Sequence, residues 1–338
     1  MSSCRLTRRH LLLAGAAALG GPVQAQGTPP LVLATYGGLW EKILREKVIP
    51  GFVKEHPATV QLELGVGSTF IPKMVASRRR APYTVVSVND DEAFLGESLG
   101  LWAPDQSSKL RNIGNVYDHL KPPALPLYAS TVYEFPLVYN PNKMPKPKSW
   151  SDLWRPGITV AVPHISDSYG ITFLYIAALL NGGGEKNLGP GFDALKRLPN
   201  MKIFKGVTQG YTMFQQGEVD AGLLHSNRAR QLKDAGVDIA WITPEEGVWG
   251  QRTGTQLPKN SLDPELGLAW IDYSLGLAAE GAFADSLYTP TNRKVEMAPE
   301  LAAKHIPPDR IDKIRFVPWQ DINPQRNDLL RRWTEEFA

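Results

Sequence analysis

Acidic side chains stand directly after two predicted strands, where they could bind a charged group of a small molecule. Asp90 and Asp91 follow the apolar run at 83–88, and Asp167 follows the run at 158–162. Each precedes a predicted helix, so its carboxylate could cap that helix or pair with the ammonium group of a ligand. The same helix N-termini offer free N–H groups to an anion. These residue types predict the binding of a small polar solute.

Motifs for covalent or metal-assisted catalysis do not occur in the sequence. It has no Gly-x-Ser-x-Gly elbow, no His-Glu-x-x-His pair and no P-loop, and Gly65-Val66-Gly67 lacks the third glycine of a dinucleotide fingerprint. The six histidines are scattered, and Cys4 is the one cysteine. We therefore expect no enzyme activity, no cofactor and no metal site. An exported enzyme and a sensor subunit for a membrane receptor are the alternatives from other functional classes.

Three strand–loop–helix units would place the first acidic pair at one edge of a sheet. Runs at 31–34, 60–66 and 83–88 are typical of strands, and each is followed by turn residues and a helical pattern. Such repeats predict a parallel sheet, and open α/β sheets bind ligands at the carboxyl edge of their strands. Within the helical pattern at 40–55, Pro50 must end or kink the helix.

A second α/β unit follows the segment 132–154, which contains a strand-like run, a spacer of proline and lysine, and a short helix that Ser149 or Ser151 can cap. The strand–helix rhythm then restarts at 158–162, and the chain turns back near 244–255. About 310 residues remain after a leader segment, more than one hydrophobic core usually holds, so two lobes are expected.

The order of these features resembles that of bacterial extracellular solute-binding proteins, in the spermidine/putrescine-binding branch. Each matching feature is a turn or a strand end and is weak alone, but eight in the family's order are specific. They are Tyr36-Gly37-Gly38, Asn89-Asp90-Asp91, 149–154, 182–184, 216–220, 233–236, 244–247 and 288–292. The resemblance implies an α/β, two-lobed, type II periplasmic-binding-protein-like fold. Each lobe would be a mixed, mainly parallel sheet with flanking helices, and two crossover strands would form the hinge.

The resemblance also implies that loops of both lobes close around a solute. The first-lobe loops contain Tyr36, Gly37, Ser68, Thr69, Asp90 and Asp91. The second-lobe loops contain Asp167, Ser168, Tyr169, Gln209, Tyr211, His225 and Ser226. The return crossover and the segment beyond it add Trp249, Gln251, Arg252 and Tyr288. Structural roles compete at each position, such as a tight turn at Gly37, an N-cap at Ser68 and a core position at Trp249.

The return crossover departs from the polyamine-binding pattern. Polyamine binders of this family usually place a tryptophan and an acid there, whereas this chain has Gln251, Arg252 and Thr253. An amino acid-like zwitterion could use Asp90 or Asp167 for its amine and Arg252 for its carboxylate. We expect a polyamine or such a zwitterionic amine as the solute, with ferric-ion, thiamine and phosphonate binding as alternatives.

The first 25 residues are typical of a cleaved export signal. Arg5, Arg8 and Arg9 precede an apolar run at 11–20, and the small residues of Val23-Gln24-Ala25 suit signal peptidase. The segment 7–12 resembles a twin-arginine signal. A membrane anchor is the alternative, but the apolar run spans only about half of a ~30 Å hydrocarbon core.

Removal of this segment would leave a formally neutral chain. The whole sequence has 37 basic and 34 acidic side chains, and three of the basic ones precede residue 26. The net charge of +3 is thus no argument for a nucleic-acid or membrane partner. We expect a periplasmic monomer in which 26–136 and 251–338 form a discontinuous first lobe and 137–250 the second. Its partners would be a small-molecule solute and an inner-membrane ABC permease with its ATPase.

Overall fold

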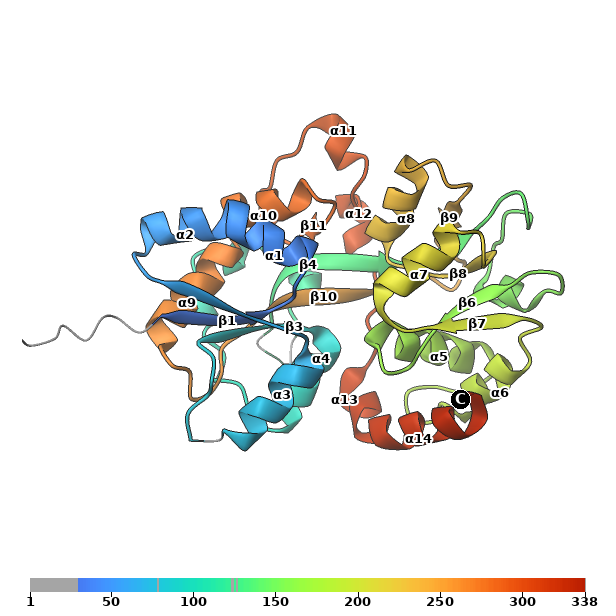
Figure 1. Ribbon diagram of the computed structural model, residues 1–338, viewed down its shortest axis with the longest axis horizontal. Coiled ribbons are helices and arrows are strands. Elements are labelled where there is room, and N and C mark those ends of the chain that lie inside the picture. The colour runs from blue at the N-terminus through green and yellow to red at the C-terminus, as the bar shows by residue number, and fades with distance from the viewer. Residues whose placement is uncertain (1–29, 78, 123–124, 126, 338) are drawn as a thin grey trace, which may run out of the picture.

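The computed structural model describes residues 30–77, 79–122, 125 and 127–337, and it shows two α/β lobes built on separate sheets (Figure 1). The predicted signal segment 1–25 lies outside the described residues. Within the described ranges, no helix combines the length and the apolar character that crossing a bilayer requires.

The first lobe contains a six-stranded sheet with the order β11-β4-β10-β3-β1-β2. The parallel pairs β1–β2 and β1–β3 come from the three predicted strand–loop–helix units, and β10 pairs antiparallel with both β3 and β4. The strands are β1 (Leu31–Thr35), β2 (Val60–Leu64), β3 (Val85–Asn89), β4 (Tyr128–Phe135), β10 (Trp249–Gln256) and β11 (Thr289–Pro290). The carboxyl ends of β1, β2 and β3 therefore share one edge, as the sequence predicted.

Helices cover both faces of this sheet, with α1, α2, α9 and α10 on one side and α3 and α4 on the other (Figure 1). Their bounds are α1 (Leu39–Ile43), α2 (Ile49–Glu55), α3 (Gly67–Ala76), α4 (Asp90–Ser98), α9 (Pro264–Ser274), α10 (Leu277–Ala284), α11 (Pro299–Ala302) and α12 (Pro308–Ile311). Pro50 does not end the first helical segment, because a π-helical turn at Leu44–Val48 places it in the first turn of α2. A missing N–H costs little at that position.

The second lobe contains a five-stranded sheet with the order β7-β6-β8-β5-β9. Strands β6, β7 and β8 are parallel, and β5 runs antiparallel to β8 and β9. The strands are β5 (Leu137–Tyr139), β6 (Val160–Pro163), β7 (Met201–Phe204), β8 (Ala221–Leu223) and β9 (Ala240–Ile242). The helices are α5 (Ser168–Leu180), α6 (Gly189–Lys196), α7 (Gly206–Gln215) and α8 (Ser226–Asp234). Two mixed sheets with flanking helices confirm the predicted fold class.

The chain passes between the sheets twice near the middle of the molecule. Strand β4 ends at Phe135 in the first sheet and β5 begins at Leu137 in the second, while β10 returns to the first sheet. The spacer after β5 is fixed by the predicted cap, because Ser149 Oγ accepts a hydrogen bond from Ser151 N at 3.0 Å. The Ser149 hydroxyl also donates to Glu246, which ties the two crossovers together.

The C-terminal helix α14 (Arg326–Phe337) packs against the second lobe, where Figure 1 shows it beneath α5 and α6, and α13 (Trp319–Ile322) also contacts α4 of the first lobe. Trp319, Ile322, Leu329 and Trp333 belong to the core formed around β5, β6 and β8. The predicted boundaries instead assigned all of 251–338 to the first lobe, and the predicted return boundary at 250/251 falls inside β10. We propose that the lobes exchange at residue 136 and between β9 and β10, with 319–337 attached to the second lobe.

Substitution of Trp333 by alanine should destabilise the second lobe. The side chain is 2% exposed and lies within that lobe's core, so its removal leaves a cavity. We expect a loss of about 3–5 kcal/mol in the free energy of unfolding, measured by urea denaturation. Arg331→Ala, on the exposed face of the same helix, is the control and should change stability little. A loss of less than about 1 kcal/mol in the Trp333 variant would contradict this packing.

Candidate functional site

Aromatic rings gather where the first lobe faces the second. The ring centroids of Tyr36 and Trp40 are 5.5 Å apart, those of Trp40 and Tyr288 5.3 Å, and those of Tyr288 and Tyr133 5.9 Å. Tyr36 directly follows β1, Tyr133 lies in β4, and Tyr288 directly precedes β11, the strand that pairs with β4. The sheet therefore brings the predicted residues Tyr36 and Tyr288 into one cluster of rings.

The cluster continues into the second lobe through His225, the N-cap residue of α8. Its ring centroid lies 5.3 Å from that of Tyr133 and 5.3 Å from that of Tyr169, in the first turn of α5. Burial, and then the charge of Arg228, lower the pKa of His225 to about 3, so the imidazole is uncharged. Its Nε2 atom is buried without a hydrogen-bond partner among the described residues, and a polar atom of a solute could supply one.

Arg228, in the first turn of α8, adds a positive charge beside these rings. Burial raises the pKa of the Tyr133 and Tyr288 hydroxyls, and the nearby Arg228 charge acts in the opposite direction. Its guanidinium donates to Gln231 Oε1 at 2.8 Å, and no ion pair within the described ranges includes it. An arginine without a carboxylate partner, next to neutral phenols, can bind an anionic group with two parallel hydrogen bonds.

Asp90 and Asp91 form buried ion pairs with arginines of the chain itself. Asp90 Oδ2 lies 3.3 Å from Arg252 Nε, and the Arg252 guanidinium also lies 4.0 Å from the centroid of the Phe316 ring. Asp91 Oδ2 accepts a hydrogen bond from Arg326 Nη1 at 3.0 Å. Burial raises the pKa of Asp90 to about 6, and the Arg252 charge opposes this shift. Both acids were predicted as ammonium partners and Arg252 as a carboxylate clamp; here each acid pairs with an arginine through Oδ2, and its Oδ1 has no hydrogen-bond partner among the described residues.

Glu92 links the three strand-end loops of the first lobe. Its Oε1 accepts from Gly67 N at 2.9 Å, and its Oε2 accepts from Asn89 N at 3.1 Å and contacts the Tyr36 hydroxyl at 3.5 Å. A side chain at residue 67 would collide with this carboxyl, since a Cβ there would lie 2.2 Å from Glu92 Cδ. Burial, followed by the charge of Asp91, raises the pKa of Glu92 to about 8.

Asp167 organises the facing loops of the second lobe. Its half-buried carboxylate accepts from the Tyr169 hydroxyl at 3.0 Å and from Gly206 N at 2.9 Å, both at Oδ2. These bonds fix the N-termini of α5 and α7 and leave Oδ1 for another partner. Beside them, Gln251 Nε2 donates to Ser168 Oγ, a hydrogen bond between β10 of the first lobe and α5 of the second.

The remaining predicted residues lie at the margin of the site or in a core. Gly37, Ser68 and Thr69 are exposed at the N-termini of α1 and α3, and the N-cap of α3 is Val66, so Ser68 is not the cap. In the second lobe, Gln209 is exposed, and its side-chain Oε1 accepts a hydrogen bond from Lys205 N at 2.8 Å. Tyr211 packs against the core of that lobe, and Ser226 lines a separate crevice. Trp249, predicted as a ligand-binding residue, is 3% exposed and packs within the second-lobe core, the competing structural role named for it above.

Sequence reasoning missed Tyr133, Glu92 and Arg228, although two of them left a signal. Asn89 and Glu92 have the spacing of a capping box, which is present in the structure. Arg228 is a basic residue in the first turn of a helix, where the helix dipole disfavours a cation, so another role was to be expected. Tyr133 gave no such signal, because β4 is buried along its whole length.

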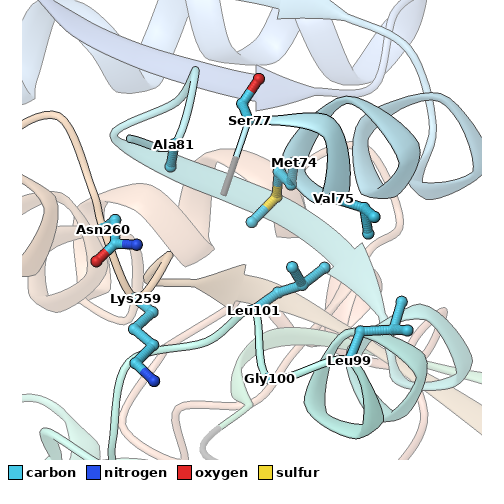
Figure 2. Close-up of a pocket in the computed structure, with 9 residues that line it drawn as sticks. All are labelled: Met74, Val75, Ser77, Ala81, Leu99, Gly100, Leu101, Lys259 and Asn260. Atoms are coloured by element: carbon cyan, nitrogen blue, oxygen red, sulfur yellow. The ribbon is translucent and has the colours of Figure 1, made fainter. Parts of the chain in front are cut away.

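A pocket of about 270 Å³ lies elsewhere, at the surface of the first lobe (Figure 2). Figure 2 shows that α3, the segment 99–101 and the segment 259–260 supply its walls. It contains none of the predicted site residues. In the described part of the chain, no three His, Cys, Asp or Glu side chains are grouped as metal ligands.

Known proteins are similar to this chain over most of its length, at low sequence identity. A family model described as "Bacterial extracellular solute-binding protein" matches residues 37–280. The spermidine/putrescine-binding periplasmic protein of Escherichia coli (strain K12) is 24% identical over 332 residues, with 93% of each chain covered. That of Salmonella typhimurium (strain LT2) is 23% identical over 313 residues, covering 88% of this chain and 86% of the relative.

Solved structures agree with this assignment at the level of the fold. An ABC transporter structure from Clostridium perfringens ATCC 13124 has a TM-score of 0.81 and 24% identity, covering 91% of this chain and 100% of its own. The structure of the Atu4243-GABA receptor has a TM-score of 0.76 and 18% identity, covering 92% of this chain and 98% of its own. The family match, which spans most of the two lobes, shows that this chain belongs to the bacterial extracellular solute-binding protein family.

Proposed function

We propose that this chain is the periplasmic solute-binding component of an ABC transporter, and that its solute is a small amino acid-like molecule with a carboxylate and an amine. Family membership and the two-lobed fold support the transport role. The observation that carries the solute class is the position of Arg228 in the first turn after His225, whose ring lies 5.3 Å from that of Tyr133, together with its lack of a carboxylate partner among the described residues.

A carboxylate held by Arg228 would contact both lobes. Arg228 belongs to α8 of the second lobe, whereas Tyr133 and Tyr288 belong to the first. Their pKa values are raised by burial, so both phenols keep their protons and can donate hydrogen bonds. A ligand closes a hinged protein only through contacts that the open state lacks, and an anion between these groups would make such contacts.

The amine of the solute would be bound by Asp167. Its carboxylate is half-buried and lies beside the ring of Tyr169. Both hydrogen bonds described above end on Oδ2, so Oδ1 can accept from an ammonium group. A carboxylate and an aromatic face are suitable partners for an ammonium group. The uncharged His225 contacts the ring of Tyr169, which bonds this acid, and could accept or donate one further hydrogen bond.

Polyamine is the competing solute, since the curated relatives are spermidine/putrescine-binding proteins. A polyamine has only ammonium groups and needs several unpaired acids. Here Asp90 and Asp91 are already paired with Arg252 and Arg326, and Arg228 would repel a cation. The same fold also serves the Atu4243-GABA receptor, so an amino acid-like solute suits this architecture. The bound solute would be delivered to an inner-membrane permease with its ATPase.

Calorimetric titration of the purified protein should separate these solutes. We expect γ-aminobutyrate or one of the common L-amino acids to bind, and spermidine to bind far more weakly or not at all. Arg228→Gln should then weaken the zwitterion's binding by about 10- to 100-fold, because hydrogen bonds to a charged group are lost. Lys233→Gln removes a charge from the exposed side of the same helix and should leave the affinity unchanged.

Tight binding of spermidine with no response to any zwitterion would contradict the proposed solute class. Equal affinities in the wild type and in Arg228→Gln would show that the carboxylate is bound elsewhere.

Protonation of Glu92, which holds the three first-lobe loops of the proposed site, should couple stability to pH. Its pKa rises from 4.5 to about 8 in the folded protein, mainly through burial. The folded state binds this proton more tightly than the unfolded state does. The resulting contribution to the free energy of unfolding is fully present below about pH 4.5 and is lost as the pH rises through about 8. Glu92→Gln resembles the protonated carboxyl and should become progressively more stable relative to the wild type across this range.

Urea unfolding of both proteins at several pH values measures this difference. Glu97→Gln, an exposed position on α4, is the matched control and should show no such trend. A constant difference between Glu92→Gln and the wild type over the whole range would mean that the carboxyl of Glu92 stays ionised.

A further inference from the structure

A small crevice, separate from the cluster of rings, lies between the lobes beside α8. Its volume is about 20 Å³, and its walls come from β4, β11 and the segment 304–310 of the first lobe and from α8 and β9 of the second. Figure 1 shows α8 and α12 as neighbours at this boundary. A volume of this size holds one water molecule or one small ion.

Most charges around the crevice are paired. Arg310 donates from Nη2 to Glu134 Oε2 at 2.8 Å, and its Nε lies 2.6 Å from Oε1 of the same carboxylate. Lys304 pairs with Asp234 at 2.9 Å. His305 contacts Thr289 Oγ1 at 3.3 Å and Ala284 O at 3.0 Å, and burial lowers its pKa, so the ring is uncharged at neutral pH.

Arg230 is the cation of the crevice that has no acidic partner within the described ranges. Its guanidinium lies over the Trp241 ring, 4.8 Å from the centroid, and its charge contributes to the lowered pKa of His305 across the lobe boundary. After the pairs of Arg310 and Lys304 are set aside, one net positive charge remains. A single monovalent anion would neutralise it.

Polar atoms facing the crevice also lack partners. Asn227 is 7% exposed and lines the crevice, and its Oδ1 has no hydrogen bond in the described part of the chain. Rotation of the Asn227 side-chain amide by 180° would place its NH2 group at this position, where it could donate a hydrogen bond into the crevice. The Nε of Arg230 is likewise buried and without a partner. Unsatisfied buried polar groups are rare in folded proteins and indicate an absent ligand or water.

We propose that this crevice binds one small monovalent anion of the size of chloride, held by Arg230 and Asn227. The positive charge favours an anion over a water molecule, and the small volume favours a monatomic halide such as chloride or bromide over a polyatomic anion. Because both lobes form the walls, the bound anion stabilises their present arrangement, and by linkage its concentration affects solute affinity. The inference does not depend on the class of solute bound at the cluster of rings.

Thermal unfolding in sodium chloride, compared with sodium gluconate at equal ionic strength, tests the site without any solute. Chloride should raise the melting temperature in a saturable manner, and gluconate, which is too large for the crevice, should not. Arg230→Gln should weaken the chloride response at least about tenfold in concentration, since the hydrogen-bonded charge is lost. Lys233→Gln, which removes an exposed charge of the same helix, should respond as the wild type does.

Diffraction from wild-type crystals soaked in bromide gives a second measurement that needs no variant. An anomalous peak within hydrogen-bond distance of Arg230 and Asn227 is expected. Equal stabilisation by chloride and gluconate, an unchanged chloride response in Arg230→Gln, or a crevice without a bromide peak would overturn the proposal and leave the crevice as a water site.

Discussion

A carboxylate buried between two lobes must be paired with a cation or hold a proton, and this constraint decides what the interlobe region can bind. Three consecutive acids, Asp90, Asp91 and Glu92, stand at the carboxyl edge of β3. The first two are paired with Arg252 and Arg326, and the third has a pKa raised to about 8. These three acids thus contribute little negative charge, and Asp167 and Arg228 remain as the acid and the cation that we propose the solute meets.

The two arginines that neutralise these acids also depend on how the chain passes between the lobes. Arg252 lies in β10, which is placed next to β3 by its antiparallel pairing. Arg326 begins α14, whose apolar face packs on the second lobe, and its Nη2 donates to Ser166 O of that lobe at 3.1 Å. One guanidinium therefore bonds Asp91 of the first lobe and a backbone carbonyl of the second. The pairing of both acids therefore depends on where β10 and α14 place their arginines.

The fold was readable from the sequence because its signals are local. Alternating or apolar runs predicted β1, β2, β3 and β6, and the order of turns predicted two lobes. The partner of α14 was not readable, because an amphipathic pattern shows that a face is buried but not against which core. The site was only partly predictable. Tyr36, Tyr169, His225 and Tyr288 do come together, whereas the ion pair of Asp90 with Arg252 joins residues far apart in sequence and needs the strand pairing to be known.

The central claim is that Arg228 selects a solute with a carboxylate. Calorimetry with a matched pair of ligands tests it most directly: the amino acid-like solute that binds best, and the same molecule with its carboxylate converted to a carboxamide. Size and amine are then constant, and only the negative charge changes. We predict that the carboxamide binds at least about tenfold more weakly, as expected for the loss of hydrogen bonds to a charged group. Equal affinity for the two molecules would contradict the account.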